Sequence, residues 1–188
     1  MNKILLYIFL FLIFYFQNLV SADEKRNVID KLKKIKSLEF KFKQKMNGVH
    51  ETGICYLVFP SKLKCNYNDD KKKELIINKN RLAVTQKRYN KTYYYSVKKS
   101  PFLKMLKKNE LIALVEKSIL SYKDNKINFT NIDSNGKKIT VFFNKKDFNL
   151  NGWEMDDQLK NKIIFFVEIL SENKEIETKI FKIPTQQY

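Results

Sequence analysis

Apolar residues recur with two different periods in residues 23–46. In residues 23–37 the apolar side chains of Val28, Leu32 and Ile35 recur every three or four positions, with lysine and arginine between them. This spacing predicts an amphipathic helix. Over residues 38–46 the period becomes two, and lysines occupy the alternate positions. That pattern is typical of a strand with one buried and one solvated face.

A hairpin is expected next, because residues 53–59 and 63–67 are apolar stretches joined by Phe59-Pro60-Ser61. If these three residues form the turn, residue i faces residue 120 − i, and Cys55 stands opposite Cys65. Cross-strand neighbours are close enough for a disulfide. Two buried free thiols packed as small apolar side chains are the alternative.

The rest of the chain predicts a single antiparallel sheet of about ten short strands. Residues 100–106 and 109–120 are expected to form helices, the first of them started by Pro101. The predicted fold class is mainly β with helices (α+β), a strongly curved sheet with helices against its inner face. The further strands are predicted at residues 74–78, 82–86, 92–97, 126–131, 138–143, 147–155, 162–170 and 178–183.

The N-terminus reads as a secretory signal peptide. Lys3 precedes 13 uninterrupted apolar residues at 4–16, and Val20-Ser21-Ala22 supplies small residues for cleavage after Ala22. The apolar run is shorter than the roughly 20 residues of a membrane-spanning helix. We therefore expect residues 1–22 to be removed and residues 23–188 to form one exported domain; an uncleaved anchor is the alternative.

Charge and composition exclude several functions. The formal charge is +17, from 37 basic and 20 acidic residues. The lysines are spread evenly rather than gathered on one element, which argues against nucleic-acid binding. The charge reflects either a coding bias or attraction to an acidic partner or membrane. The single histidine, His50, lies in an expected polar loop at residues 47–52, and the chain has no phosphate loop, serine elbow or metal-ligand spacing. We expect no enzyme, metal or cofactor.

Six short segments, taken in order, resemble the LolA family of periplasmic lipoprotein carriers. The resemblance runs from about Val28 to Pro184. The segments are Phe42-Lys43-Gln44, Gly53-Ile54-Cys55-Tyr56-Leu57 followed by Pro60, Tyr67, Ser100-Pro101-Phe102-Leu103, Leu150-Asn151-Gly152-Trp153-Glu154-Met155-Asp156, and Phe181-Lys182-Ile183-Pro184.

The resemblance implies an unclosed, strongly curved antiparallel β-barrel with a helical lid. It also implies a periplasmic monomer that accepts triacylated lipoproteins from an inner-membrane LolCDE-type transporter. The carrier would pass them to an outer-membrane LolB-type acceptor where one is present. One position departs from the family, which usually has arginine before the hairpin proline; that arginine helps to hold the lid closed. Here the position is Phe59, which either makes the cavity more apolar or is simply part of the core.

Acyl chains need an apolar concavity, and one strand face with the lid helix offers candidate walls. The candidate acyl-binding residues are Phe40, Phe42, Leu57, Phe59, Leu63, Tyr67, Phe102, Leu103 and Leu106. Each could instead be an ordinary core residue beneath a helix. A secreted lipid-sensing or structural β-domain without a transport role is the competing function.

Overall fold

The computed structural model describes residues 23–98, 102–132, 136–156 and 161–185. The predicted signal peptide (1–22) and the expected helix start at Ser100-Pro101 lie outside the described residues. A helix at residues 23–34 precedes the first strand. The strands are β1 (Ser37–Met46), β2 (Val49–Val58), β3 (Lys62–Tyr67), β4 (Lys73–Asn78), β5 (Arg81–Gln86), β6 (Lys91–Ser96), β7 (Ile119–Lys123), β8 (Lys126–Ile132), β9 (Lys138–Asn144), β10 (Leu150–Asp156) and β11 (Lys162–Glu172). The helices are α2 (Phe102–Met105) and α3 (Lys108–Lys117), with single 3-10 turns η1 (Lys87–Tyr89) and η2 (Thr178–Phe181).

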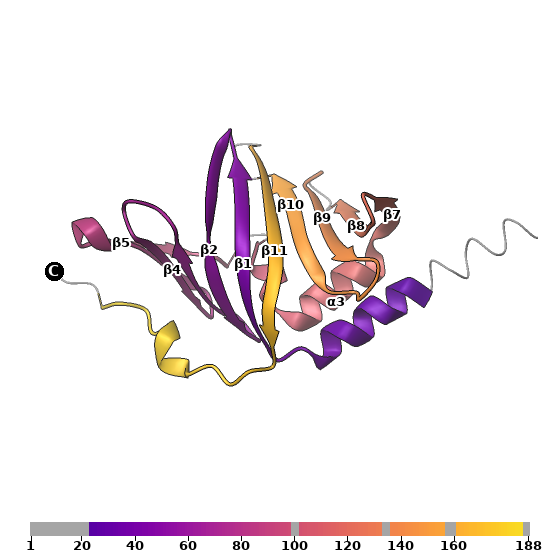
Figure 1. Ribbon diagram of the computed structural model, residues 1–188, viewed down its shortest axis with the longest axis horizontal. Helices are drawn as coiled ribbons and strands as arrows, with labels where there is room; N and C mark the ends of the chain where they lie inside the picture. Colours follow the sequence, from indigo (N-terminus) through magenta and orange to yellow (C-terminus); the bar gives the residue numbers. More distant parts are fainter. Residues whose placement is uncertain (1–22, 99–101, 133–135, 157–160, 186–188) are drawn as a thin grey trace, which may run out of the picture.

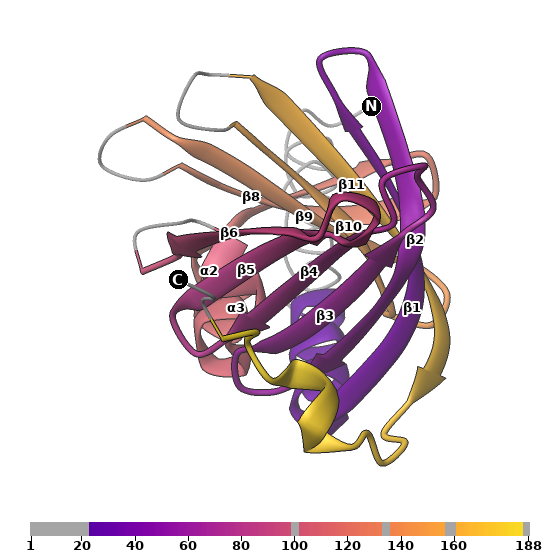
Figure 2. The ribbon, with the colours of Figure 1, turned by 90° about the vertical axis from the view of Figure 1, so that its left-hand side faces the viewer.

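All eleven strands form one antiparallel sheet in the order β6-β5-β4-β3-β2-β1-β11-β10-β9-β8-β7. Every neighbouring pair is a sequential hairpin or meander except β1 and β11, which join the two ends of the chain at the centre of the sheet. The sheet is strongly curved and unclosed, with β6 and β7 at its edges (Figures 1 and 2). The predicted fold class is therefore confirmed.

Two-residue turns set the local register. Asn47 and Gly48, which join β1 to β2, have φ values of 49° and 78°. Positive φ at both central residues is the geometry that matches the twist of paired strands. The expected polar loop at 47–52 is wrong in extent, because this tight turn lets β2 begin at Val49. His50 is exposed on β2, opposite Lys45.

The second predicted helix ends earlier than expected. The apolar residues Ile119 and Leu120 belong to strand β7, not to α3. At the C-terminus of α3 the Ser118 hydroxyl donates to the Leu114 carbonyl at 2.7 Å, and the chain leaves in an extended conformation. β8 then supplies the backbone partners that turn this apolar stretch into an edge strand.

The last predicted strand, residues 178–183, is also wrong. β11, the strand that precedes this segment in the sequence, already pairs with β1 and β10, so the segment cannot add to the sheet beside it. It forms η2 and crosses the outer face of the sheet, where Phe181 is fully buried. The Asn78 amide donates to the Phe181 carbonyl at 3.1 Å, and the Tyr94 hydroxyl donates to the Pro184 carbonyl at 3.2 Å.

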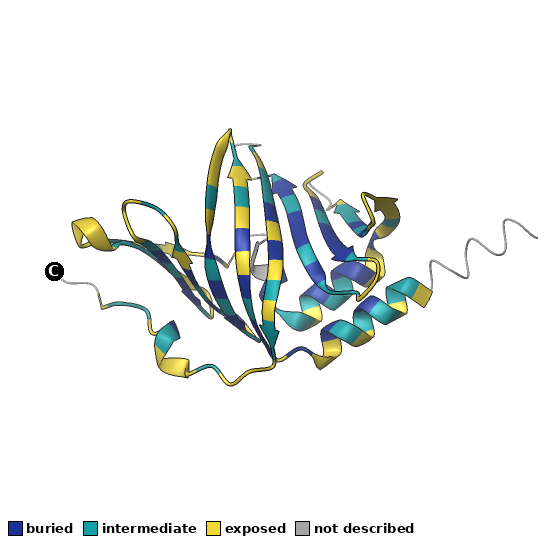
Figure 3. Cartoon of the chain, in the orientation of Figure 1, coloured by how far each residue is buried: buried dark blue, intermediate teal, exposed yellow. Residues whose placement is uncertain are grey.

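The helices cover part of the inner face, as the sequence predicts. Val28, Leu32 and Ile35 from the N-terminal region share one core with residues of α3 and the sheet (Figure 3). Lys25 donates to the carbonyls of Glu116 and Ser118 at 3.0 and 3.3 Å. A cation at these last carbonyls of α3 complements the helix dipole, so the two helices are fixed side by side.

Candidate functional site

The inner face of the first half of the sheet is a continuous apolar surface. Strand register places Phe40 of β1 opposite Cys55 of β2, and Cys55 opposite Cys65 of β3. One step towards the start of β1, Leu38, Leu57 and Leu63 follow one another across the same strands. All of these side chains are buried; they share one face because successive residues of a strand point to opposite sides.

The structure brings most of the predicted acyl-binding residues together. They belong to one apolar cluster, in which Phe59 and Tyr67 are partly buried and the others are buried; these are Phe40, Phe42, Leu57, Leu63 and Leu106. Phe102 and Leu103 fall in α2, but their side chains lie outside the described residues. Burial in one cluster shows that these residues share a face; their contact with an acyl chain stays a prediction.

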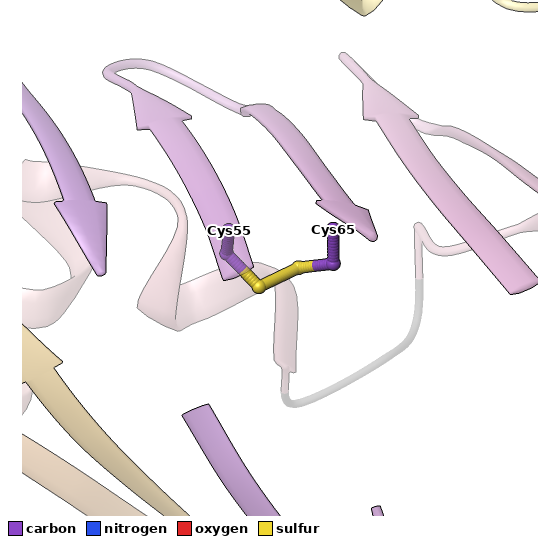
Figure 4. The surroundings of a disulfide bond; sticks show 2 residues. All are labelled: Cys55 and Cys65. Atoms are coloured by element: carbon purple, nitrogen blue, oxygen red, sulfur yellow. A yellow bond between two sulfur atoms is a disulfide. The ribbon is translucent and has the colours of Figure 1, made fainter. Parts of the chain in front are cut away.

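Cys55 and Cys65 are joined by a disulfide in the structure, with a Cα–Cα distance of 4.1 Å (Figure 4). The expected register, with residue i opposite residue 120 − i, is confirmed from Gly53 and Tyr67 to Leu57 and Leu63. The bond lies on the inner face and ties β2 to β3 in the middle of the apolar surface.

Aromatic rings from four strands, β3, β1, β11 and β10, form a row across the inner face. Phe42 makes an edge contact with Tyr67 at 4.9 Å and stacks on Phe165 at 5.0 Å between ring centroids. Phe165 in turn stacks on Trp153 at 4.3 Å. Sequence reasoning did not select Phe165 and Trp153 as site residues. Both residues belong to strands that the sequence predicts, but their inward orientation follows from the pairing of β10 with β9 and β11.

Gly53 makes this row possible. It is the β2 residue that faces both Phe42 on β1 and Tyr67 on β3. A Cβ atom at Gly53 would lie 2.7 Å from Cε1 of Phe42 and would overlap the Asn66 carbonyl oxygen. The missing side chain therefore leaves space for the Phe42 ring to lie over β2 and reach Tyr67.

Burial of the inner face decreases towards the β6 edge. Ile77 of β4 is buried, whereas Leu82 and Val84 of β5 are only half-buried. On β6, Tyr93 and Tyr95 face Val84 and Leu82, and these tyrosines are 44% and 54% exposed. This side of the apolar surface is left partly uncovered by the described helices (Figure 3).

A backbone hydrogen bond joins the predicted lid segment, α2 and Leu106, to the turn between β2 and β3. The Ser61 N–H donates to the Leu106 carbonyl at 2.8 Å, directly after α2. Leu106 and its neighbour Met105 are buried beneath this contact. Opening the lid would break the bond and expose both side chains.

Phe59 directly precedes the hairpin proline, at the position where the resemblance to the LolA family would place arginine. It packs half-buried against the core, and the Lys108 ammonium of α3 lies 5.6 Å from the centroid of its ring. A cation within about 6 Å of an aromatic face is attracted to it by about 0.5–1 kcal/mol. At this contact the positive charge is therefore on Lys108 of α3, and the group on the sheet side is the aromatic ring of Phe59.

Polar side chains gather on the same inner face, at the end next to the β1–β2 turn. Glu51 forms an ion pair with Lys73 and accepts a hydrogen bond from the Gln44 amide at 3.3 Å. The Lys73 ammonium lies 3.8 Å from the centroid of the Tyr67 ring. Burial, followed by the charges of Glu51 and Asp69, raises the pKa of Tyr67.

This geometry defines a curved, open half-barrel whose apolar inner face lies under helices, an architecture suited to an apolar ligand. The family model described as "Outer membrane lipoprotein carrier protein LolA" matches residues 33–184. The chain belongs to the LolA family, a family of carriers rather than of known enzymes, and its fold supports lipid or lipoprotein binding.

Three solved structures that match the chain have low sequence identity to it. Lipoprotein LppX of Mycobacterium tuberculosis is 14% identical with a TM-score of 0.45, over 84% of this chain and 97% of that one. LprF of Mycobacterium bovis is 12% identical with a TM-score of 0.49, over 84% and 94% of the two chains. A LolA superfamily protein of Nitrosomonas europaea is 7% identical with a TM-score of 0.43, over 84% and 97%.

No curated protein matches the sequence. Among the described residues, none of the helices has the length and apolar character needed to cross a membrane.

Proposed function

We propose that the protein is a periplasmic carrier that binds the acyl chains of lipoproteins on its inner face and moves them from the inner to the outer membrane. Its partners would be triacylated lipoproteins, a LolCDE-type transporter for loading and, where present, a LolB-type acceptor for unloading. The signal peptide expected at residues 1–22 would direct the chain, as a monomer, to this compartment. Membership of the LolA family supports this proposal.

Crossing an aqueous compartment is the physical problem that such a carrier solves. Each acyl methylene exposed to water costs about 0.8 kcal/mol. A chain of about 16 carbons therefore resists transfer through water by on the order of 10 kcal/mol. Only an apolar surface of comparable extent lowers this barrier, and its affinity must stay low enough for release at the outer membrane.

The observation that carries the proposal is the partly uncovered apolar surface of β4, β5 and β6. The half-buried Val84 and the exposed Tyr93 and Tyr95 extend the apolar core outwards on the inner face. A structural β-domain with a filled core would cover such side chains, whereas a carrier needs them accessible. Exposed aromatic side chains that border an apolar core are candidates for a binding surface.

A double substitution on β6 tests the role of this surface. Tyr93→Glu/Tyr95→Glu is expected to weaken binding of a soluble fluorescent tripalmitoylated lipopeptide about tenfold or more, because two charges would replace apolar contacts. The dissociation constant is measured by fluorescence anisotropy. In cells depleted of the native protein, this variant should leave outer-membrane lipoproteins in the inner membrane.

Ser96→Glu is the matched control, because Ser96 is also exposed on β6 but faces the opposite side of the sheet from Tyr95. It should bind the lipopeptide like the wild type and restore lipoprotein sorting. Equal affinity of the double variant and this control would reject the inner face as the binding surface. Normal sorting in depleted cells would reject the shuttle.

A further inference from the structure

The inner face is not apolar throughout. At the end next to the β1–β2 turn, four neighbouring strands each contribute a polar side chain to the concave side: Gln44 from β1, Glu51 from β2, Tyr67 from β3 and Lys73 from β4. Strand alternation would allow apolar residues at all four positions. A ligand bound on this face would meet these side chains with its polar part.

The hydrogen-bond donors of this polar cluster make few hydrogen bonds to the residues that the structure describes. The side chains of Lys73 and Glu51 are only 20% and 23% exposed, and they hold each other in place. Within the described part of the chain, no hydrogen bond to the Tyr67 hydroxyl is seen, although its ring packs against Phe42 and beneath Lys73. Tyr67 is partly buried, and its hydroxyl is free to donate to an acceptor that a ligand supplies.

The polar cluster lies at one end of the aromatic row. Tyr67 belongs to both, since its ring contacts Phe42 at one end of the row that runs on to Phe165 and Trp153. An amphiphile whose chain lies along these rings would therefore have its polar end beside Tyr67 and Lys73. The groups that join fatty acyl chains to a head group are ester and amide carbonyls, which accept hydrogen bonds and donate none through oxygen.

We infer that Tyr67 and Lys73, positioned by Glu51 and Gln44, form a subsite for the carbonyl groups that link acyl chains to their head group. This inference rests on the proposed lipid-carrier function and adds the polar part of ligand recognition to it. Tyr67 donates through its hydroxyl and Lys73 through its ammonium. Two sources carry this chemistry, the acylated N-terminus of a lipoprotein and a membrane phospholipid.

A comparison of ester and ether lipids tests the subsite. The probes are a soluble dipalmitoyl-glyceryl lipopeptide with ester links, the same lipopeptide with ether links, and the matched ester and ether short-chain phosphatidylcholines. The wild type is expected to prefer each ester over its ether about fivefold, the effect of one or two net hydrogen bonds. In Tyr67→Phe this ratio should fall towards equality.

The ratio of ester to ether affinity separates recognition of the carbonyl group from apolar packing, because any loss of apolar contact affects the ester and ether forms alike. Tyr56→Phe is the matched control: Tyr56 is on β2 but faces the outer side, next to Lys64 of β3. It should keep the wild-type ratio. Urea unfolding of each variant verifies that the fold is retained.

The possible outcomes distinguish failure of the carbonyl subsite from failure of the carrier function. Ester preference with the lipopeptide alone, or with both lipids, supports the subsite and identifies its source. Tight binding of ester and ether forms without preference overturns the subsite and leaves the carrier function standing. Absence of binding by any probe overturns both. An ester preference that survives Tyr67→Phe assigns the recognition elsewhere and overturns the role of Tyr67.

Discussion

Replacing Gly152 with alanine is expected to lower the free energy of unfolding by about 3 kcal/mol. Gly152 has a φ of +144°, a conformation that L side chains rarely adopt. A Cβ atom there would overlap the Phe165 carbonyl oxygen and lie 2.6 Å from Cε2 of Phe142. Urea denaturation followed by circular dichroism measures the change.

Gly48→Ala is the control for backbone conformation alone. Gly48 also has positive φ, +78°, but a Cβ there meets nothing within 4 Å. Its expected cost is about 1 kcal/mol. Equal losses in the two variants would show that close packing at Gly152 contributes nothing.

Gly152 matters beyond stability because it orients Trp153. The pairing of β10 with β9 shifts register between Leu150 and Gly152. This bulge lets Leu150 and Trp153, which differ by an odd number of positions, both face inwards and be buried. A regular strand would turn one of them to the outside.

Breaking the disulfide is the second change with a large expected effect. Cys55 and Cys65 close a loop with a sequence separation of 10, and opening such a loop costs about 2–3 kcal/mol through the entropy of the unfolded chain. The urea midpoint of the wild type should therefore fall in dithiothreitol. Cys55→Ala/Cys65→Ala should start from the lower midpoint and should not respond to dithiothreitol.

Thiol alkylation and mass spectrometry establish that the bond is broken under these conditions. If the reduced wild type unfolds at the same urea concentration as the oxidised protein, the disulfide does not stabilise the fold. The apolar contacts of β2 and β3 would then be sufficient to hold the inner face.

The sequence predicts what is decided locally. The turn at Pro60 and strand alternation together specify the Cys55–Cys65 register, because both act within a dozen residues. The same reasoning fails at Ile119 and Leu120, where apolar residues continue the helical spacing of α3 but pair with β8 instead. Local period cannot show which backbone partner is available.

Long-range arrangement accounts for the other differences. The pairing of β1 with β11 joins distant segments and, with β10 on the other side, leaves residues 178–183 no free edge at β11. The contribution of Phe165 and Trp153 to the aromatic row depends on this pairing and on the bulge at Gly152. Neither feature has a signature within a single strand, so the sequence indicated the inner face but not its aromatic row.

Trp153 offers the most direct test of the central claim that acyl chains bind on the inner face. It is the only tryptophan in the chain, and it is stacked on Phe165 within the apolar cluster. A tripalmitoylated lipopeptide with bromine atoms on its acyl chains should quench Trp153 fluorescence on binding, whereas the unbrominated lipopeptide should not. Binding of the brominated lipopeptide without quenching would place the chains elsewhere and contradict the account.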